Sequence, residues 1–282
     1  MENASGPIWT LSGFGDEIDD DPDLQCVVLQ ALGASHLDLR SAWKTNILAL
    51  DDEQVEHLRA CLIRRGVRVS AIASPIGKID IGLPIANSLA SLERAITLAR
   101  IFESNYIRIF SFYRAPEQSA EEIRDAVLER MAALARRAER DGVTLVHENE
   151  KGIYGDTPER VSDLIESIGS DRLRVVWDPA NFVQVGVHPH SEGYAMLAPY
   201  IDYVHIKDAR FAKGAVTPAG EGDGEILDTI SALIAANYAG FVSLEPHLST
   251  EGNAGGVPSA ATFGIAARAF RRLAEQSGVT LQ

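Results

Sequence analysis

Cysteine is scarce in this sequence, whose 282 residues contain only Cys26 and Cys61. Each lies in an apolar stretch with helical spacing, and neither belongs to a CxxC pair or a similar ligand spacing. This pattern argues against a disulfide framework, a thiolate zinc site and a thiol redox centre. We expect two buried, reduced thiols.

Basic residues are also few compared with acidic ones. The chain has 26 Lys and Arg residues against 40 Asp and Glu residues, which gives a formal net charge of -14 and a pI near 4.9. Such a chain repels phosphate backbones and anionic membranes over long range, although a local basic pocket can still hold a small anion. We expect neither nucleic acid nor a membrane as a partner.

Long hydrophobic runs are absent. No uninterrupted apolar run reaches the roughly 18 residues of a membrane span, and the first residues, MENASGPIWTL, lack the basic start and apolar core of a signal peptide. With 46% hydrophobic and 23% charged residues, the composition is that of an ordinary folded protein. We therefore expect a cytoplasmic protein.

Strand-like and helix-like segments alternate along the chain. Eight short runs are rich in β-branched and aromatic residues, at 8–14, 36–40, 67–74, 106–112, 143–149, 173–178, 201–208 and 241–246. Helical spacing of apolar residues lies between them. The clearest examples are 51–66, with acidic residues at its start and Gly66 at its end, and 119–142, with Ser119 as N-cap and Gly142 as stop.

This alternation predicts a parallel sheet, because a parallel neighbour is reached only through a crossover connection. Eight such units in about 280 residues match a closed (β/α)8 TIM barrel, forming a single domain over residues 1–282. An open doubly wound sheet is the alternative. The first strand leads into SGFGDE, which is not a GxGxxG fingerprint, so nothing favours a dinucleotide-binding fold.

The active site of such a barrel lies at the carboxyl ends of its strands. Four successive strands end in polar residues there, and these are Glu148 in LVHENE, Asp178 in VVWDPAN, His205 in YVHIKD and Glu245 in SLEPH. Three carboxylates that converge with one imidazole strongly disfavour joint ionisation unless a cation lies among them. Alone, each residue has an ordinary explanation as a turn or core residue; together they indicate a divalent metal site.

Oxygen ligands with a single nitrogen suit Mn²⁺, Mg²⁺ or Co²⁺ better than a structural zinc ion. We expect Mn²⁺, with Mg²⁺, Co²⁺ and Zn²⁺ as alternatives.

The motifs GVTLVHENEKGIYGDTPE, LRVVWDPANF, IDYVHIKDAR, PAGEGDGEI and GFVSLEPH follow one another over residues 142–247. In this order they resemble the sugar isomerase and epimerase group with the xylose isomerase-like TIM barrel. The resemblance implies that Glu148, Asp178, His205 and Glu245 are the metal ligands. It also implies a small carbohydrate substrate and assembly as a homodimer or a homotetramer.

The expected reaction is a proton transfer. A metal that chelates a carbonyl and its neighbouring hydroxyl stabilises the enediolate formed when a proton leaves the carbon between them. Glu148 and Glu245 are the expected acid and base, one withdrawing the proton and the other returning one. Return to the opposite face is epimerisation, and return to the neighbouring carbon is aldose–ketose isomerisation.

Residues near the strand ends are candidates for binding the substrate. In the epimerases of the group a histidine commonly follows the aspartate ligand by three residues, but this chain has Asn181 there, with His188 further on. An arginine is expected soon after the histidine ligand, where Arg210 lies. The candidates are Arg210, Lys207, Lys78, Glu17 and His188.

Three other functions remain open from the sequence. The first is a metal-dependent dehydratase or lyase on an inosose-like keto-polyol, in which a β-hydroxyl is lost after the same deprotonation. The second is a non-catalytic sugar-binding barrel, which ought to have lost one of the two glutamates. The third is a multi-zinc endonuclease barrel. That chemistry needs more histidine ligands and a basic groove, whereas this chain offers seven histidines in all on an acidic background.

Overall fold

All eight strands predicted from the sequence are present in the computed structural model, which describes residues 6–248 and 259–282. They are β1 (Ile8–Gly13), β2 (His36–Leu39), β5 (Arg68–Ala73), β6 (Tyr106–Ile109), β7 (Thr144–Glu148), β8 (Leu173–Trp177), β9 (Ile201–Ile206) and β12 (Phe241–Leu244). Each is shorter than its apolar run by one to three residues, because the last residues of the run leave the sheet and form the loops around the site.

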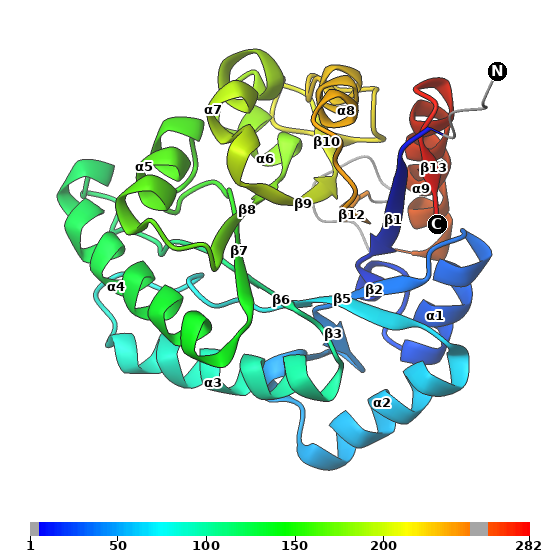
Figure 1. Ribbon diagram of the computed structural model, residues 1–282, viewed down its shortest axis with the longest axis horizontal. Helices are drawn as coiled ribbons and strands as arrows, with labels where there is room; N and C mark the ends of the chain where they lie inside the picture. The colour runs from blue at the N-terminus through cyan, green and yellow to red at the C-terminus, as the bar shows by residue number, and fades with distance from the viewer. Residues whose placement is uncertain (1–5, 249–258) are drawn as a thin grey trace.

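The strands form one parallel sheet in the order β13-β1-β12-β9-β8-β7-β6-β5-β2, in which β13 (Thr280–Leu281) adds to the start of β1. A parallel bridge between Phe14 and Asp38 joins the β1 end of the sheet to β2, so the sheet curls into a ring (Figure 1). The fold is therefore an α/β TIM barrel, as predicted, and not an open doubly wound sheet.

Helices cover the outside of the ring (Figure 1). Their bounds are α1 (Pro22–Ala31), α2 (Asp52–Arg65), α3 (Ile85–Ile101), α4 (Ala120–Asp141), α5 (Pro158–Ile168), α6 (Pro179–Val183), α7 (Ala195–Leu197), α8 (Ile226–Ala235) and α9 (Ala260–Gln276), with single turns η1 (Gly15–Glu17), η2 (Ile47–Ala49), η3 (Pro189–Tyr194) and η4 (Ala198–Tyr200) between them. Within the described ranges, no helix is both long and apolar enough to span a bilayer.

The two helices predicted most clearly begin and end as their end signals indicate. Asp51 caps α2 and Ser119 caps α4, each in a reciprocal capping box with the residue three positions later. Both helices stop at a glycine in the left-handed conformation, Gly66 with φ 66° and Gly142 with φ 74°.

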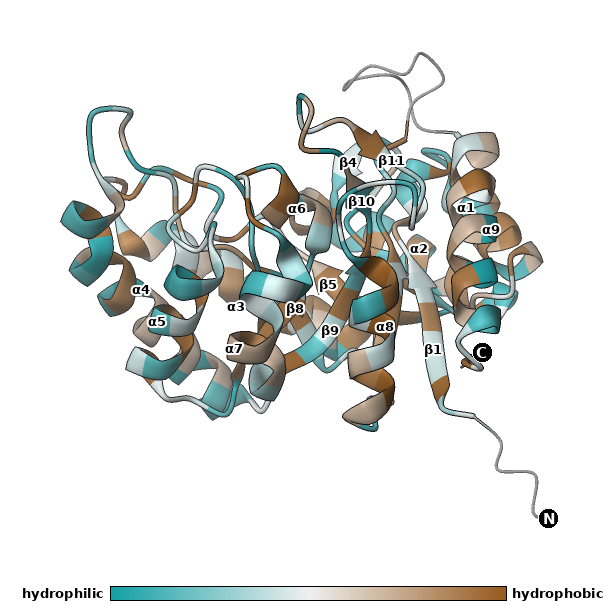
Figure 2. Ribbon diagram, turned by 90° about the horizontal axis from the view of Figure 1, so that it is seen from above, coloured by the Kyte–Doolittle hydropathy of each residue, from teal (hydrophilic) through white to brown (hydrophobic). Residues whose placement is uncertain are grey.

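The seventh predicted strand differs from the prediction at its end. β9 stops at Ile206, and β10 (Asp208–Ala209) pairs instead with β11 (Val216–Thr217) in an antiparallel ribbon. The Asp208 carboxylate accepts the backbone N–H groups of Gly220, Gly222 and Gly224 at 2.9, 3.0 and 2.9 Å, which pulls the chain away from the barrel sheet. This ribbon and β4 (Thr45–Asn46), which pairs with β3 (Ser41–Ala42), lie in the upper part of Figure 2.

A buried carboxylate lies inside the barrel among strands from distant parts of the chain. Asp38 of β2 accepts hydrogen bonds from hydroxyls of four other strands, namely Ser12 at 2.7 Å, Ser70 at 3.0 Å, Ser243 at 2.5 Å and Tyr203 at 2.8 Å. Because an unsatisfied buried carboxylate is costly, these bonds favour only the arrangement in which all five strands meet.

The apolar core fills the space between the sheet and the helices. Cys26 and Cys61 both belong to the buried interior and are free thiols, as predicted. Burial raises the pKa of the Cys26 thiol to about 12, so this group stays protonated and unreactive at neutral pH.

Candidate metal centre

The four predicted ligands all lie at the carboxyl ends of barrel strands. Glu148 is the last residue of β7, Asp178 follows β8 directly, His205 belongs to β9 and Glu245 follows β12. Each residue is at most 2% exposed. The parallel register brings these strand ends to one level, and alternation along each strand turns the side chains into the barrel.

One ligand atom from each of these residues lies within 4.8 Å of every other. His205 Nδ1 is 3.6 Å from Glu148 Oε1, 3.9 Å from Asp178 Oδ2 and 3.4 Å from Glu245 Oε2. Ligands that share one cation at about 2.1 Å each are separated by roughly 3 to 4 Å. The predicted residues are thus brought together at a spacing that one divalent ion fits.

Three buried atoms of this cluster have no hydrogen-bond partner, namely Glu148 Oε2, Asp178 Oδ2 and His205 Nδ1. Lys207 Nζ lies 2.7 Å from Asp178 Oδ2, and Arg108 Nη1 lies 3.1 Å from Glu148 Oε2. Both contacts are ion pairs without hydrogen-bond alignment. Buried polar atoms are rarely left unpaired in a native protein. Convergent polar atoms without hydrogen bonds fit a divalent cation, and the donor set of three carboxylates and one imidazole is one that such cations take.

Two asparagines hold the ligand residues in place, one through the carboxylates and one through the backbone. Asn181 donates from Nδ2 to Glu148 Oε1 at 3.1 Å, and its backbone N–H donates to Asp178 Oδ1 at 2.9 Å. Asn149 bridges the ends of β7 and β8, donating to the Asp178 carbonyl at 2.9 Å and accepting its N–H at 3.1 Å. Asn181, at the position where we noted a histidine in related epimerases, therefore orients one ligand through its side chain and another through its backbone.

Burial and charge together shift the proton affinities of the cluster. Burial raises the pKa of the Asp178 carboxyl to about 6, opposed by Lys207. Burial lowers the pKa of His205, but the carboxylates of Glu148 and Glu245 outweigh it and raise the value to about 10. A metal ion needs the neutral imidazole, so its binding to these residues releases a proton.

Three basic side chains surround the ligands. Lys207 lies 2.7 Å from Asp178 Oδ2 and 3.0 Å from Glu245 Oε2. Arg108 contacts Glu245 Oε1 at 3.4 Å in addition to Glu148, and Arg40 contacts the same Glu245 oxygen at 3.0 Å.

Sequence reasoning missed both arginines. Arg108 could have been found as a charge inside the apolar strand YIRIF, and Arg40 as the residue that follows the strand HLDL directly.

A cavity of about 150 Å³ opens above the cluster. Its lining residues are Arg40, Asn46, Ala73, Pro75, Lys78, Arg108, Glu148, Glu150, Glu245 and His247. Lys78, one of the predicted substrate-binding residues, lies at the wall of this cavity. Glu17 is buried behind the wall, where it accepts from Arg40 at 3.3 Å and from the His247 backbone N–H at 2.7 Å.

Two of the predicted substrate-binding residues lie away from this cavity. Arg210 is exposed in the loop between β10 and β11, where its backbone N–H bonds the carbonyl of Ala215 at 2.9 Å. His188 is exposed as well, and its ring packs against Phe211 at 4.6 Å. Arg210 directly follows β10, which pairs with β11 and not with the barrel sheet. Its position is therefore set by this ribbon and not by the end of β9.

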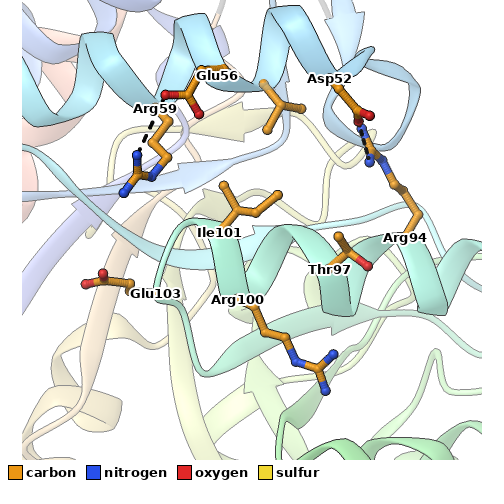
Figure 3. Close-up of a pocket in the computed structure, with 9 residues that line it drawn as sticks. Asp52, Glu56, Arg59, Arg94, Thr97, Arg100, Ile101 and Glu103 are labelled. Atoms are coloured by element: carbon orange, nitrogen blue, oxygen red, sulfur yellow. Dashed lines mark hydrogen bonds and ion pairs between the residues drawn. The ribbon is translucent and has the colours of Figure 1, made fainter.

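A larger hollow of about 640 Å³ lies in the helical shell between α2 and α3 (Figure 3). Two ion pairs lie among its lining residues, Arg94 with Asp52 at 3.2 Å and Arg59 with Glu56 at 3.8 Å. The side chains drawn in Figure 3 include neither a histidine nor a cysteine. We place the chemistry at the smaller cavity, because the unpaired ligand atoms are there.

A family model described as xylose isomerase-like TIM barrel matches residues 28–280. The chain belongs to this family. Among solved structures, it is similar to a xylose isomerase-like TIM barrel protein from Mycobacterium smegmatis in complex with magnesium, with a TM-score of 0.70 and 22% identity over 97% of this chain and 98% of that one. A probable 3-DHS dehydratase from Bacillus anthracis gives a TM-score of 0.72 and 16% identity over 93% and 98%. At these identities the likeness shows the fold alone.

One curated protein is similar over a shorter stretch. It is 2-epi-5-epi-valiolone 7-phosphate 2-epimerase from Actinoplanes sp., which is 30% identical over 96 residues. The match covers 34% of each chain, so this chain aligns with about a third of that epimerase.

Proposed function

We propose that this protein is a divalent-metal-dependent isomerase or epimerase of a sugar or sugar derivative. Glu148 and Glu245 are its acid and base, and Glu148, Asp178, His205 and Glu245 hold the metal. Mn²⁺ is the proposed ion, since three carboxylates with one imidazole suit it well. The carrying observation is that two buried glutamates approach the same point from β7 and β12, strands that are separated in the sheet by β8 and β9.

The two glutamates divide the proton transfer between them. When bound, the divalent cation supplies Lewis acidity at a substrate carbonyl and so makes the adjacent C–H more acidic. One carboxylate takes the proton from that carbon, and the other, approaching from a different direction, delivers a proton to the opposite face or to the neighbouring carbon. Microscopic reversibility exchanges their roles in the reverse direction.

Arg108 positions both proton carriers. Its Nη1 atom lies 3.1 Å from Glu148 Oε2 and 3.4 Å from Glu245 Oε1, so one guanidinium nitrogen fixes the spacing between the two carboxylates. The ring of Phe14 lies 5.2 Å from this guanidinium and packs against the His205 ring, which covers the site with apolar surface and excludes water.

A second candidate is a dehydratase or lyase acting on an inosose-like keto-polyol. The observation that favours it is His247 at the cavity wall, whose Nε2 lies 3.6 Å from Glu245 Oε1. Loss of a β-hydroxyl needs a proton donor near the base, and an imidazole beside Glu245 provides one. A dehydratase of the same fold is among the similar structures.

The decisive experiment incubates Mn²⁺-loaded protein in D₂O with ketoses, hydroxypyruvate and inososes and follows them by proton NMR. Isomerisation or epimerisation gives deuterium incorporation without water loss, whereas dehydration gives new vinylic signals. Glu148→Gln and Glu245→Gln should each abolish incorporation while the circular dichroism spectrum is unchanged. Glu56→Gln on the helical shell is the matched control, and wild-type rates in either site variant would contradict the two-base mechanism.

A further inference from the structure

The basic side chains at the cavity are all engaged by carboxylates of the protein itself. Among the described residues, the lysines and arginines at the wall and beside the ligands form the following ion pairs: Arg40 with Asp16, Glu17 and Glu245; Lys78 with Glu150; Arg108 with Glu148 and Glu245; and Lys207 with Asp178 and Glu245.

The remaining basic side chain at the wall is engaged as well. His247 Nε2 lies 3.1 Å from Glu17 Oε1 and 3.6 Å from Glu245 Oε1. In the described part of the chain, an anionic substrate therefore meets no basic group at this wall that lacks a carboxylate partner.

Lys78 has the most exposed side chain among these lysines and arginines, at 32%. It is held firmly in place. Nζ lies 2.8 Å from Glu150 Oε2 and 4.2 Å above the centre of the Phe110 ring. The loop that carries it is tied to the next strand end, with the Phe110 N–H on the Ile76 carbonyl at 2.8 Å and the Phe112 N–H on the Gly77 carbonyl at 2.9 Å.

An anionic group at this wall has to displace Glu150 from Lys78 and leave that carboxylate unpaired beside a second negative charge. Such unpaired and like-charge arrangements are what make a site reject a competing ligand. A hydroxyl group needs no such exchange, because it donates to a carboxylate and accepts from an ammonium or guanidinium at the same time. An ion pair at the wall therefore offers a polyol both a hydrogen-bond donor and a hydrogen-bond acceptor.

We propose that the site selects uncharged polyhydroxy carbonyl compounds and rejects their phosphorylated or carboxylated counterparts, with the Lys78–Glu150 pair as the specificity determinant. This inference rests on the proposed function for the chemistry at the metal. The cavity volume of about 150 Å³ agrees with it, since this is smaller than the roughly 300 Å³ and above of drug-sized ligand sites and suits a single small ring or chain.

The test compares matched substrates in D₂O with Mn²⁺-loaded protein. The pairs are D-tagatose with D-tagatose 6-phosphate and D-fructose with D-fructose 6-phosphate. The uncharged member of a pair should exchange its α-proton at least about tenfold faster at equal concentration, which corresponds to one broken ion pair. Faster exchange of the anionic members would overturn the inference and leave the proposed function standing.

The substitution Glu150→Gln tests the same pair by a gain of anion binding. Freed from its carboxylate, Lys78 should accept anions, so the ratio of anionic to neutral exchange rates should rise about tenfold. Glu56→Gln removes a carboxylate from the Arg59 pair on the helical shell and should leave the ratio unchanged. An unchanged ratio in Glu150→Gln would show that the Lys78–Glu150 pair does not determine substrate specificity.

A binding measurement separates this inference from the reaction itself. If no compound exchanges, the proposed function fails, and calorimetric titration of inorganic sulfate into the loaded proteins still tests the pair. Glu150→Gln should bind sulfate more tightly than wild type, and since both share the same metal site, the difference reports Lys78. Equal affinities would refute the role of the pair whatever the substrate is.

Discussion

The ammonium nitrogen of Lys207 lies 2.7 Å from Oδ2 of Asp178, one of the four clustered residues. The same nitrogen donates to Glu245 Oε2 at 3.0 Å. A lysine is therefore directed at two of the oxygens that the proposed metal needs. Without the metal it holds the carboxylates together, and it competes with the metal for them.

Lys207→Met should therefore tighten metal binding. We expect the Mn²⁺ dissociation constant to fall roughly tenfold or more, because one positive neighbour is removed from the ligands. The melting temperature of the metal-free protein should fall at the same time, because the carboxylates lose a counter-charge. Calorimetry and thermal melts in EDTA measure the two effects. Lys78→Met is the control, and weaker metal binding in Lys207→Met would contradict the competition.

Asp178→Asn should separate ligation from folding. Asn caps a helix as well as Asp does, so the hydrogen bond to the Asn181 N–H that starts α6 should persist. The charge at Oδ2 is lost, and we expect metal affinity to fall by about 100-fold or more. Metal analysis after dialysis gives the occupancy, with Asp163→Asn in α5 as the control. Equal metal content in Asp178→Asn and wild type would rule Asp178 out as a ligand.

Asp38→Ala should be among the most destabilising changes in the barrel. It removes the acceptor of four buried hydroxyls, and we expect a loss of about 3–5 kcal/mol in the free energy of unfolding. Tyr203→Phe removes one of the four donors and should cost only about 1–2 kcal/mol. Urea denaturation measures both. A smaller loss for Asp38→Ala than for Tyr203→Phe would show that this network contributes little.

His36 should make stability depend on pH. Burial, with the charge of Arg68, lowers its pKa from 6.5 to about 4 in the folded protein. Between these values the unfolded chain binds the proton and the folded chain does not, so this contribution is complete above pH 6.5 and is lost progressively down to pH 4. The loss is roughly 3 kcal/mol.

His36→Gln should flatten the pH profile of unfolding between pH 6.5 and 4, as measured by urea denaturation at several pH values. The same substitution at the exposed His188 is the control. Parallel profiles for wild type and His36→Gln would mean that His36 takes up its proton without unfolding.

The barrel and the ligand cluster could be predicted because both depend on local pattern. Apolar runs separated by helices specify parallel strands, and a polar residue directly after such a run must lie at the carboxyl end of the barrel. Glu148, Asp178 and Glu245 satisfy that condition by position alone. Their joint spacing then follows from the fold.

The surroundings of the cluster could not be predicted in the same way. Arg40 and Arg108 matter through contacts with Glu245, 205 and 137 residues further along the chain. Nothing in their immediate sequence specifies those partners. Arg210 is the opposite case. It lies close to the His205 strand in the sequence, but the β10–β11 ribbon places it away from the cavity. That ribbon depends on the Asp208 side chain and glycines more than ten residues away.

Glu245 is the common partner of Arg40, Arg108 and Lys207. It follows β12, the last strand of the ring to be synthesised, whereas all three cations precede it in the chain. A nascent barrel therefore carries these cations before their shared counter-ion has left the ribosome. Translation order thus makes Glu245 the last of these four residues to be synthesised.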